Sequence, residues 1–143
     1  MQCRETKWHR EQFPDGVDVI DAMIETALEE NEYQRKEDRA RKAAGDRDYV
    51  HISPKITKAQ AKEWAIEVAL HLGAMNPSLP GWHSTDPYWI MNSAYKQAVE
   101  RGGERNPGQF GYLIAMEAMG HGRAWTDNNP DPDFEVPQHQ PNW

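Results

Sequence analysis

Start and stop signals for helices recur along this chain of 143 residues. Thr57 and Gln60 form a capping box, while Asp86-Pro87 and Asn106-Pro107 place a capping side chain directly before a proline. Glycines, which end helices readily, follow the apolar stretches. They stand at Gly45, Gly73, Gly102, Gly103, Gly120 and Gly122. These signals predict an all-α fold, a small bundle of about four helices, with the first over about 17–44 and the others starting after Thr57, Asp86 and Asn106.

The pattern divides the chain into three parts. Residues 1–16 are expected to form an irregular N-terminal arm, and residues 17–125 a single helical domain. Residues 126–143 are rich in Pro and Asp and poor in apolar side chains, so burial cannot offset the entropy of ordering them. We therefore expect a flexible, disordered acidic tail there.

The predicted first helix changes character along its length. Its first half is amphipathic, whereas residues 32–42 alternate acidic and basic side chains with little apolar content. Acids at the front and bases at the back complement the helix dipole. The charged half is predicted to project from the domain or to pair with a second subunit, which would make the protein a homo-oligomer with a structural or assembly role.

The first half of this helix carries an acidic stripe, defined as Asp18, Asp21, Glu25, Glu29 and Glu32. At about 100° per residue these five positions fall within a narrow arc. No lysine or arginine interrupts residues 17–32. The stripe is either the solvated face of an amphipathic helix or a surface that imitates a phosphate backbone and docks on a basic protein. In size, charge and this one stripe, the chain resembles the small acidic proteins with which mobile elements block restriction or CRISPR enzymes.

Charge and composition exclude several other classes. The net charge of −7 argues against direct binding of nucleic acid or of an anionic membrane. No apolar run approaches the roughly 18–20 residues of a membrane span, and the polar start of the chain does not resemble a signal peptide. A single cysteine, Cys3, fits a reducing compartment. We therefore expect a cytoplasmic protein.

Aromatic residues gather around the predicted third helix. Six tryptophans are many for this length, and Trp82, Tyr88, Trp89 and Tyr95 lie close together in the sequence. Tryptophan anchors interfaces because it buries a large area and keeps a polar group. Trp82 and Trp89 are therefore candidate partner-binding residues, although packing in the core explains Trp64 and Trp89 equally well.

Two Glu-His pairs are weak candidates for a metal site. Glu67 with His71, and Glu117 with His121, each stand four residues apart on one helix face. If the two helices packed side by side, the four groups would converge on a metal ion, as in a metal-binding bundle or hydrolase. Surface polar pairs explain the same spacing, so we predict no metal and no cofactor.

The chain lacks the common signatures of catalysis. It contains no GxGxxG, GxxxxGK[ST] or GxSxG motif and no Cys-His metal pattern. Asp86 follows His83 closely but is better explained as a helix cap than as part of a catalytic pair. The sequence therefore favours a non-enzymatic protein-protein interaction protein, a phage or mobile-element inhibitor among the settings that fit, acting through the acidic stripe with Trp82 and Trp89.

Overall fold

The computed structural model describes residues 7–45, 51–79, 86–121 and 134–141. Within these ranges the chain is helical and contains no strand, which confirms the predicted all-α class. There are five helices in this described part of the chain: α1 (Lys7–Gln12), α2 (Pro14–Ala43), α3 (Lys58–Met75), α4 (Pro87–Glu100) and α5 (Pro107–Ala118).

The three predicted helix starts are confirmed by their capping bonds. The Thr57 hydroxyl accepts the Gln60 N–H at 3.1 Å, and the Gln60 side chain accepts the Thr57 N–H in return. The Asp86 carboxylate accepts the Tyr88 N–H, and the Asn106 side chain accepts the Gln109 N–H. These helix starts could be predicted from the sequence because a helix cap involves only residues within one turn.

The N-terminal region differs from the predicted irregular arm. Residues Lys7–Gln12 form α1, and α2 begins at Pro14, three residues before the predicted start. Proline at the first helical position is favourable because its missing N–H needs no partner there. The helix α1 is fixed by tertiary contacts: the His9 ring stacks on Tyr88 at 4.6 Å, and His9 Nε2 lies 3.4 Å from Asp86 Oδ2. Local sequence carries no signal for these contacts.

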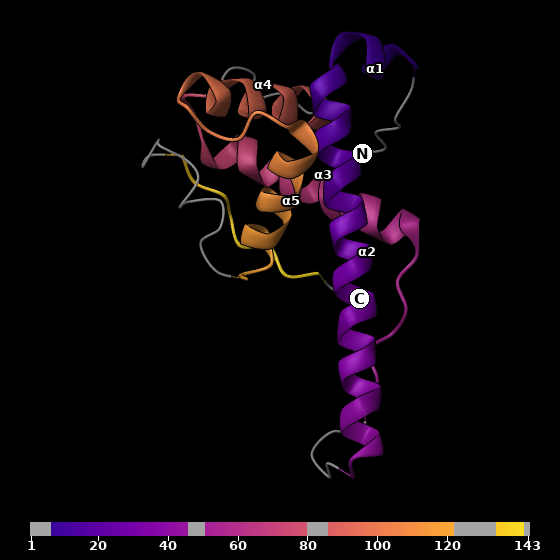
Figure 1. The fold of residues 1–143 in the computed structure, drawn as a ribbon. Coiled ribbons are helices and arrows are strands. Elements are labelled where there is room, and N and C mark those ends of the chain that lie inside the picture. The colour runs from indigo at the N-terminus through magenta and orange to yellow at the C-terminus, as the bar shows by residue number, and fades with distance from the viewer. Residues whose placement is uncertain (1–6, 46–50, 80–85, 122–133, 142–143) are drawn as a thin grey trace.

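The hydrophobic core surrounds the first half of α2. Helices α3, α4 and α5 gather around this half in Figure 1, and their apolar side chains bury Val17, Ile20 and Met23 completely. The residues that face the core recur every three or four positions, as expected of one helix face. The acidic stripe is thereby turned away from the core.

Two glycines let other helices approach α2 closely. A Cβ atom on Gly16 would lie 2.0 Å from the Tyr88 carbonyl oxygen of α4. A Cβ atom on Gly111 of α5 would lie 2.3 Å from the Val19 carbonyl oxygen of α2. Since neither distance is tolerable for real atoms, the helix packing requires glycine at both positions.

The second half of α2 extends beyond this core, and residues 51–57 run alongside it (Figure 1). Its only buried side chains are polar, Asn31 and Asp38. Asn31 donates to the Pro54 carbonyl and accepts the Ile56 N–H, while Asp38 accepts both the N–H and the hydroxyl of Ser53. Hydrogen bonds to one extended segment thus hold this half of the helix.

Part of the predicted flexible tail is packed against the helices. Residues 134–141 have no regular secondary structure, and Phe134 is buried in the core. The Asn76 side chain both donates to the Glu135 carbonyl and accepts the Glu135 N–H, and Trp64 Nε1 donates to the His139 carbonyl at 3.0 Å. One buried aromatic ring and these hydrogen bonds to the backbone stabilise the segment, although its composition is polar. The predicted tail residues 126–133 and 142–143 lie outside the described residues.

None of the helices in the described ranges is both long and apolar enough to cross a membrane.

Candidate functional site

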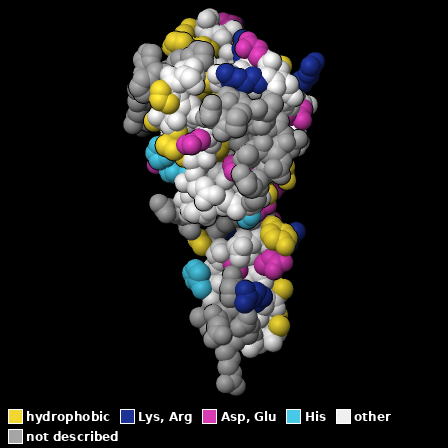
Figure 2. All heavy atoms as spheres, turned by 90° about the vertical axis from the view of Figure 1, so that its left-hand side faces the viewer, with side chains coloured by type: hydrophobic (Ala, Val, Ile, Leu, Met, Phe, Trp, Pro, Cys, Tyr) yellow, Lys and Arg dark blue, Asp and Glu magenta, His cyan; other side chains and the backbone are white. Residues whose placement is uncertain are grey.

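The acidic stripe lies on the outer face of α2. Asp18, Glu25, Glu29 and Glu32 are exposed and Asp21 is half-exposed. The stripe begins where α2 packs on the core. It ends where the second half of α2, called the extension below, starts. Figure 2 shows the side of the molecule that carries α4 and α5, and on the described part of this side acidic and basic side chains are scattered singly.

Two of the five stripe residues have basic neighbours. Arg10 of α1 lies 3.9 Å from Asp21, and Arg39 lies 3.5 Å from Glu32, with all four side chains about half-exposed. Such exposed pairs contribute little to stability and exchange readily for other partners. Among the described residues, no ion pair involves Asp18, Glu25 or Glu29. The middle of the stripe is therefore open to an external positive charge.

A hollow of about 380 Å³ opens beside the stripe. Asp21 and Glu25 supply its acidic wall, and Ile24 and Leu28 of the same helix supply apolar surface. Lys58, at the start of α3, completes the lining. The lining thus combines two carboxylates, aliphatic surface and one lysine.

An exposed aromatic surface lies at the N-terminal end of α2. The Phe13 ring stacks on Trp89 of α4 with centroids 6.1 Å apart, and Trp8 of α1 meets Phe13 edge-on at 5.7 Å. Trp8 is 55% exposed and Trp89 is 42% exposed. Arg10 links α1, which carries Trp8, to Asp21 of the stripe.

The tryptophans that the sequence singled out have different environments. Trp64 is buried in the core, as expected from packing. Trp89 is exposed, which leaves its candidate role as an anchor open. Trp82 lies outside the described residues. Sequence reasoning missed Trp8 and Phe13, because the contact between these two rings depends on the helix α1, which it did not predict.

The two Glu-His pairs do not come together. Glu67 contacts His139 of the C-terminal segment at 3.2 Å, and the rings of His71 and His139 meet edge-on. His121 instead lies 3.4 Å from Glu30 of α2. Within the described ranges, no three His, Cys, Asp or Glu side chains are placed to hold a metal ion. Glu67 and His71 both lie on α3, as predicted, whereas His121 lies beyond the end of α5 at Ala118 and so does not share a helix face with Glu117.

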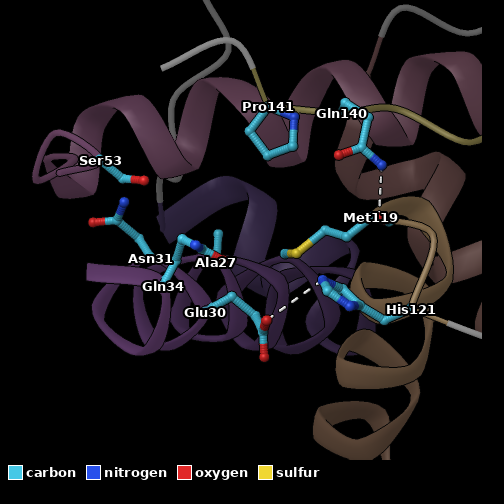
Figure 3. A pocket seen from close by; sticks show the side chains of 9 residues that line it. All are labelled: Ala27, Glu30, Asn31, Gln34, Ser53, Met119, His121, Gln140 and Pro141. Atoms are coloured by element: carbon cyan, nitrogen blue, oxygen red, sulfur yellow. Dashed lines mark hydrogen bonds and ion pairs between the residues drawn. The ribbon is translucent and has the colours of Figure 1, made fainter. Parts of the chain in front are cut away.

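The contact between His121 and Glu30 borders a cavity of about 210 Å³. Figure 3 shows these two side chains pointing toward one another, with Gln140 and Pro141 of the C-terminal segment on the facing wall. Asn31 and Ser53 stand at its far end. The sequence gives no signal for this cavity, since its walls come from four separate segments.

No known protein family, curated protein or solved structure matches this chain. The function must therefore be argued from the surfaces described above.

Proposed function

We propose that this protein is a non-enzymatic interaction protein that docks the acidic stripe on a basic surface of another protein. The proposal rests on one observation: all five stripe side chains are at least partly exposed on one face of α2. Two exposed tryptophans, Trp8 and Trp89, accompany them. Acidic side chains attract a basic partner and speed its encounter, while aromatic rings add affinity by burying apolar area. A basic surface of this kind is typical of nucleic-acid-binding proteins.

The geometry of the stripe supports imitation of a phosphate backbone. Helical positions three or four apart lie about 5–6 Å from one another along the axis. Five carboxylates therefore form a row of negative charges with a spacing comparable to that of phosphates along one strand. A small inhibitor from a phage or another mobile element, acting in the cytoplasm, is the biological setting that fits this design.

The hollow beside the stripe supplies a second element of recognition. A lysine or arginine side chain from the partner would meet the carboxylates of Asp21 and Glu25 at its charged end. Its aliphatic stem would pack on Ile24 and Leu28. The stripe would thus select a protruding basic side chain as well as a positive potential.

The proposal is tested by charge reversal with a matched control. The test variant carries Asp21→Lys, Glu25→Lys and Glu29→Lys. The control carries Glu63→Lys, Glu100→Lys and Glu135→Lys, which changes the net charge equally at exposed positions elsewhere. Proteins captured from host lysate by the wild type are purified, and direct binding is then measured at low and high salt.

The expected result is a defined partner whose affinity falls steeply with salt and is lost in the stripe variant but kept in the control. Added nucleic acid should compete if the partner's nucleic-acid groove is the docking site. Equal binding by both triple variants would show that the stripe is only a solvated helix face. A Trp89→Ala variant then measures the aromatic contribution, for which a hot-spot residue gives about 2 kcal/mol or more.

Self-association is a second candidate, favoured by the extension of α2. This half projects beyond the core, and Tyr33 on it is largely exposed. Its alternating charges would pair with those of a second copy across an antiparallel contact. Mass in solution over a wide concentration range decides the matter, because a constant monomer mass would remove this candidate.

A further inference from the structure

The cavity bordered by Glu30 and His121 is large enough for a small molecule. Its volume of about 210 Å³ exceeds the roughly 150 Å³ of an engineered cavity that holds benzene. Its walls are contributed by α2, the segment 51–57, the residues after α5 and the C-terminal segment. Four parts of the chain that are distant in sequence thus line one open pocket.

Three side chains of this wall donate a hydrogen bond within the protein. Asn31 Nδ2 donates to the Pro54 carbonyl, and the Ser53 hydroxyl donates to Asp38. Gln140 Nε2 donates to the Met119 carbonyl at 2.6 Å (Figure 3). The strongest acceptor in the wall is the carboxylate of Glu30. A guest that pairs with this carboxylate must bring a donor.

The charge of the lining leads to the same conclusion. Among the described residues that line the cavity, Glu30 is the only carboxylate, and none is a lysine or an arginine. His121 Nε2 lies 3.4 Å from Glu30 Oε2 and fixes the carboxylate at the edge of the space. Ala27, Met119 and Pro141 supply apolar surface. The lining combines one negative group with a short apolar wall.

From these observations we propose that the cavity binds a compact organic cation, a primary ammonium or guanidinium group on a short aliphatic body. The cation would pair with the Glu30 carboxylate, and the body would pack on Met119 and Pro141. Charge-assisted hydrogen bonds of this kind are about twice as strong as neutral ones. The same chemistry is offered by a free small amine and by an arginine side chain of another protein.

This site is independent of the acidic stripe. Glu30 does not belong to the stripe, because the helix turns it about 100° away from Glu29. The cavity also involves no residue of the hollow beside the stripe. Failure of one proposal would therefore leave the other unaffected.

The test is a titration of the full chain followed by two-dimensional NMR. The probes are butylguanidinium and a capped Gly-Arg-Gly peptide, with butyrate and butanol as controls of similar size. So small a ligand is expected to bind with Kd of about 1–10 mM. Chemical shifts of residues in the cavity wall should change with butylguanidinium and not with either control. Equal changes with butanol or butyrate, or none with butylguanidinium, would overturn the proposal.

Variants separate the role of Glu30 from that of overall charge. Glu30→Gln should weaken butylguanidinium binding about tenfold, since it removes a charged acceptor. Glu29→Gln, which changes the charge equally outside the cavity, should leave it unchanged. His121→Asn should retain binding, because the carboxylate remains. Unchanged binding in Glu30→Gln, or an equal loss in Glu29→Gln, would contradict the assignment.

The two cationic probes distinguish the source of the ligand. Binding of butylguanidinium alone would indicate a free small molecule, because the peptide backbone would then be excluded. Binding of the Arg peptide with similar or greater affinity would indicate an arginine side chain of a partner protein. Both results support the cation site and differ only in its occupant.

Discussion

The two halves of α2 are one continuous helix, yet they are stabilised by different forces. The first half packs apolar side chains such as Ile20 and Met23 into a core shared with three other helices. The second half buries only Asn31 and Asp38, and both are hydrogen-bonded to the segment 51–57. Regions with few buried apolar contacts open locally at a lower free energy than the core. We therefore expect the extension to open without unfolding the core.

The largest loss of stability should come from a substitution that adds atoms between α2 and α5. Gly111→Ala places a Cβ atom 2.3 Å from the Val19 carbonyl oxygen and 2.8 Å from the Ala22 Cβ atom. The helices must separate, so the free energy of unfolding should fall by about 3 kcal/mol or more. Chemical denaturation measures the loss. Gln109→Ala, at an exposed position of the same helix, should cost less than about 0.5 kcal/mol, and a similar cost for both would refute the close-packing argument.

A smaller and more local effect should follow from Asp38→Ala. The substitution leaves the Ser53 N–H and hydroxyl without their acceptor, at a cost of about 1–3 kcal/mol. Hydrogen exchange should accelerate over residues 31–43, while the amides of residues 17–27 keep their protection. Uniform acceleration along all of α2 would show that the two halves open together. Glu37→Ala, at the neighbouring exposed position, serves as the control.

The C-terminal segment should behave like the extension. Asn76 makes two hydrogen bonds with the backbone of Glu135, so Asn76→Ala should release this end of the segment at a cost of about 1–3 kcal/mol. Trp64→Phe removes the bond to the His139 carbonyl and should cost about 1 kcal/mol. The amides of Glu135 and His139 should then exchange faster than those of the core. Unchanged exchange at both would mean that the other contacts of the segment, such as buried Phe134 and the bond from the His139 N–H to the Ala118 carbonyl, are sufficient to fix it.

The parts of the fold that could be predicted from the sequence are those that depend on local or periodic features. Caps at Thr57, Asp86 and Asn106 are local, and so the three helix starts that they mark are confirmed. The apolar faces of α2 to α5 are periodic and therefore visible in one dimension. The predicted end of the second helix, at Gly73, falls two residues short of Met75, because nothing local forces a stop there.

Contacts between distant segments were not predictable. α1 depends on His9 meeting Tyr88 and Asp86, and the C-terminal segment depends on Asn76 and Trp64. The cavity requires Glu30 and His121 to meet across 91 positions of sequence. A polar side chain that hydrogen-bonds to the backbone of a distant segment produces no periodic pattern in the sequence. The functional roles of the acidic stripe and of Trp89 stay predictions, since the structure fixes only their exposure.

The smallest predicted effect compares two tyrosines, one in each region. Burial raises the pKa of Tyr95 above its ordinary value of 10.0, and the charges of Asp15 and Glu104 raise it further. Tyr33, on the extension, is exposed, and its pKa is raised by a hydrogen bond with Glu37 and by the charge of Glu37. Glu37→Gln should therefore bring the pKa of Tyr33 back toward its ordinary value and leave that of Tyr95 unchanged. Titration of the two ring signals by NMR measures both.

The consequence for stability concerns the core tyrosine. Above pH of about 10 the unfolded chain loses the phenolic proton, while folded Tyr95 keeps it. The folded state then binds more protons, so the free energy of unfolding falls as pH rises through this range. Tyr95→Phe should remove that part of the fall, and it should also cost about 1 kcal/mol at neutral pH through the lost bond to the Arg105 carbonyl. A pH dependence unchanged by Tyr95→Phe, but abolished by Tyr33→Phe, would place the titrating group on the extension and reverse the comparison between the two halves.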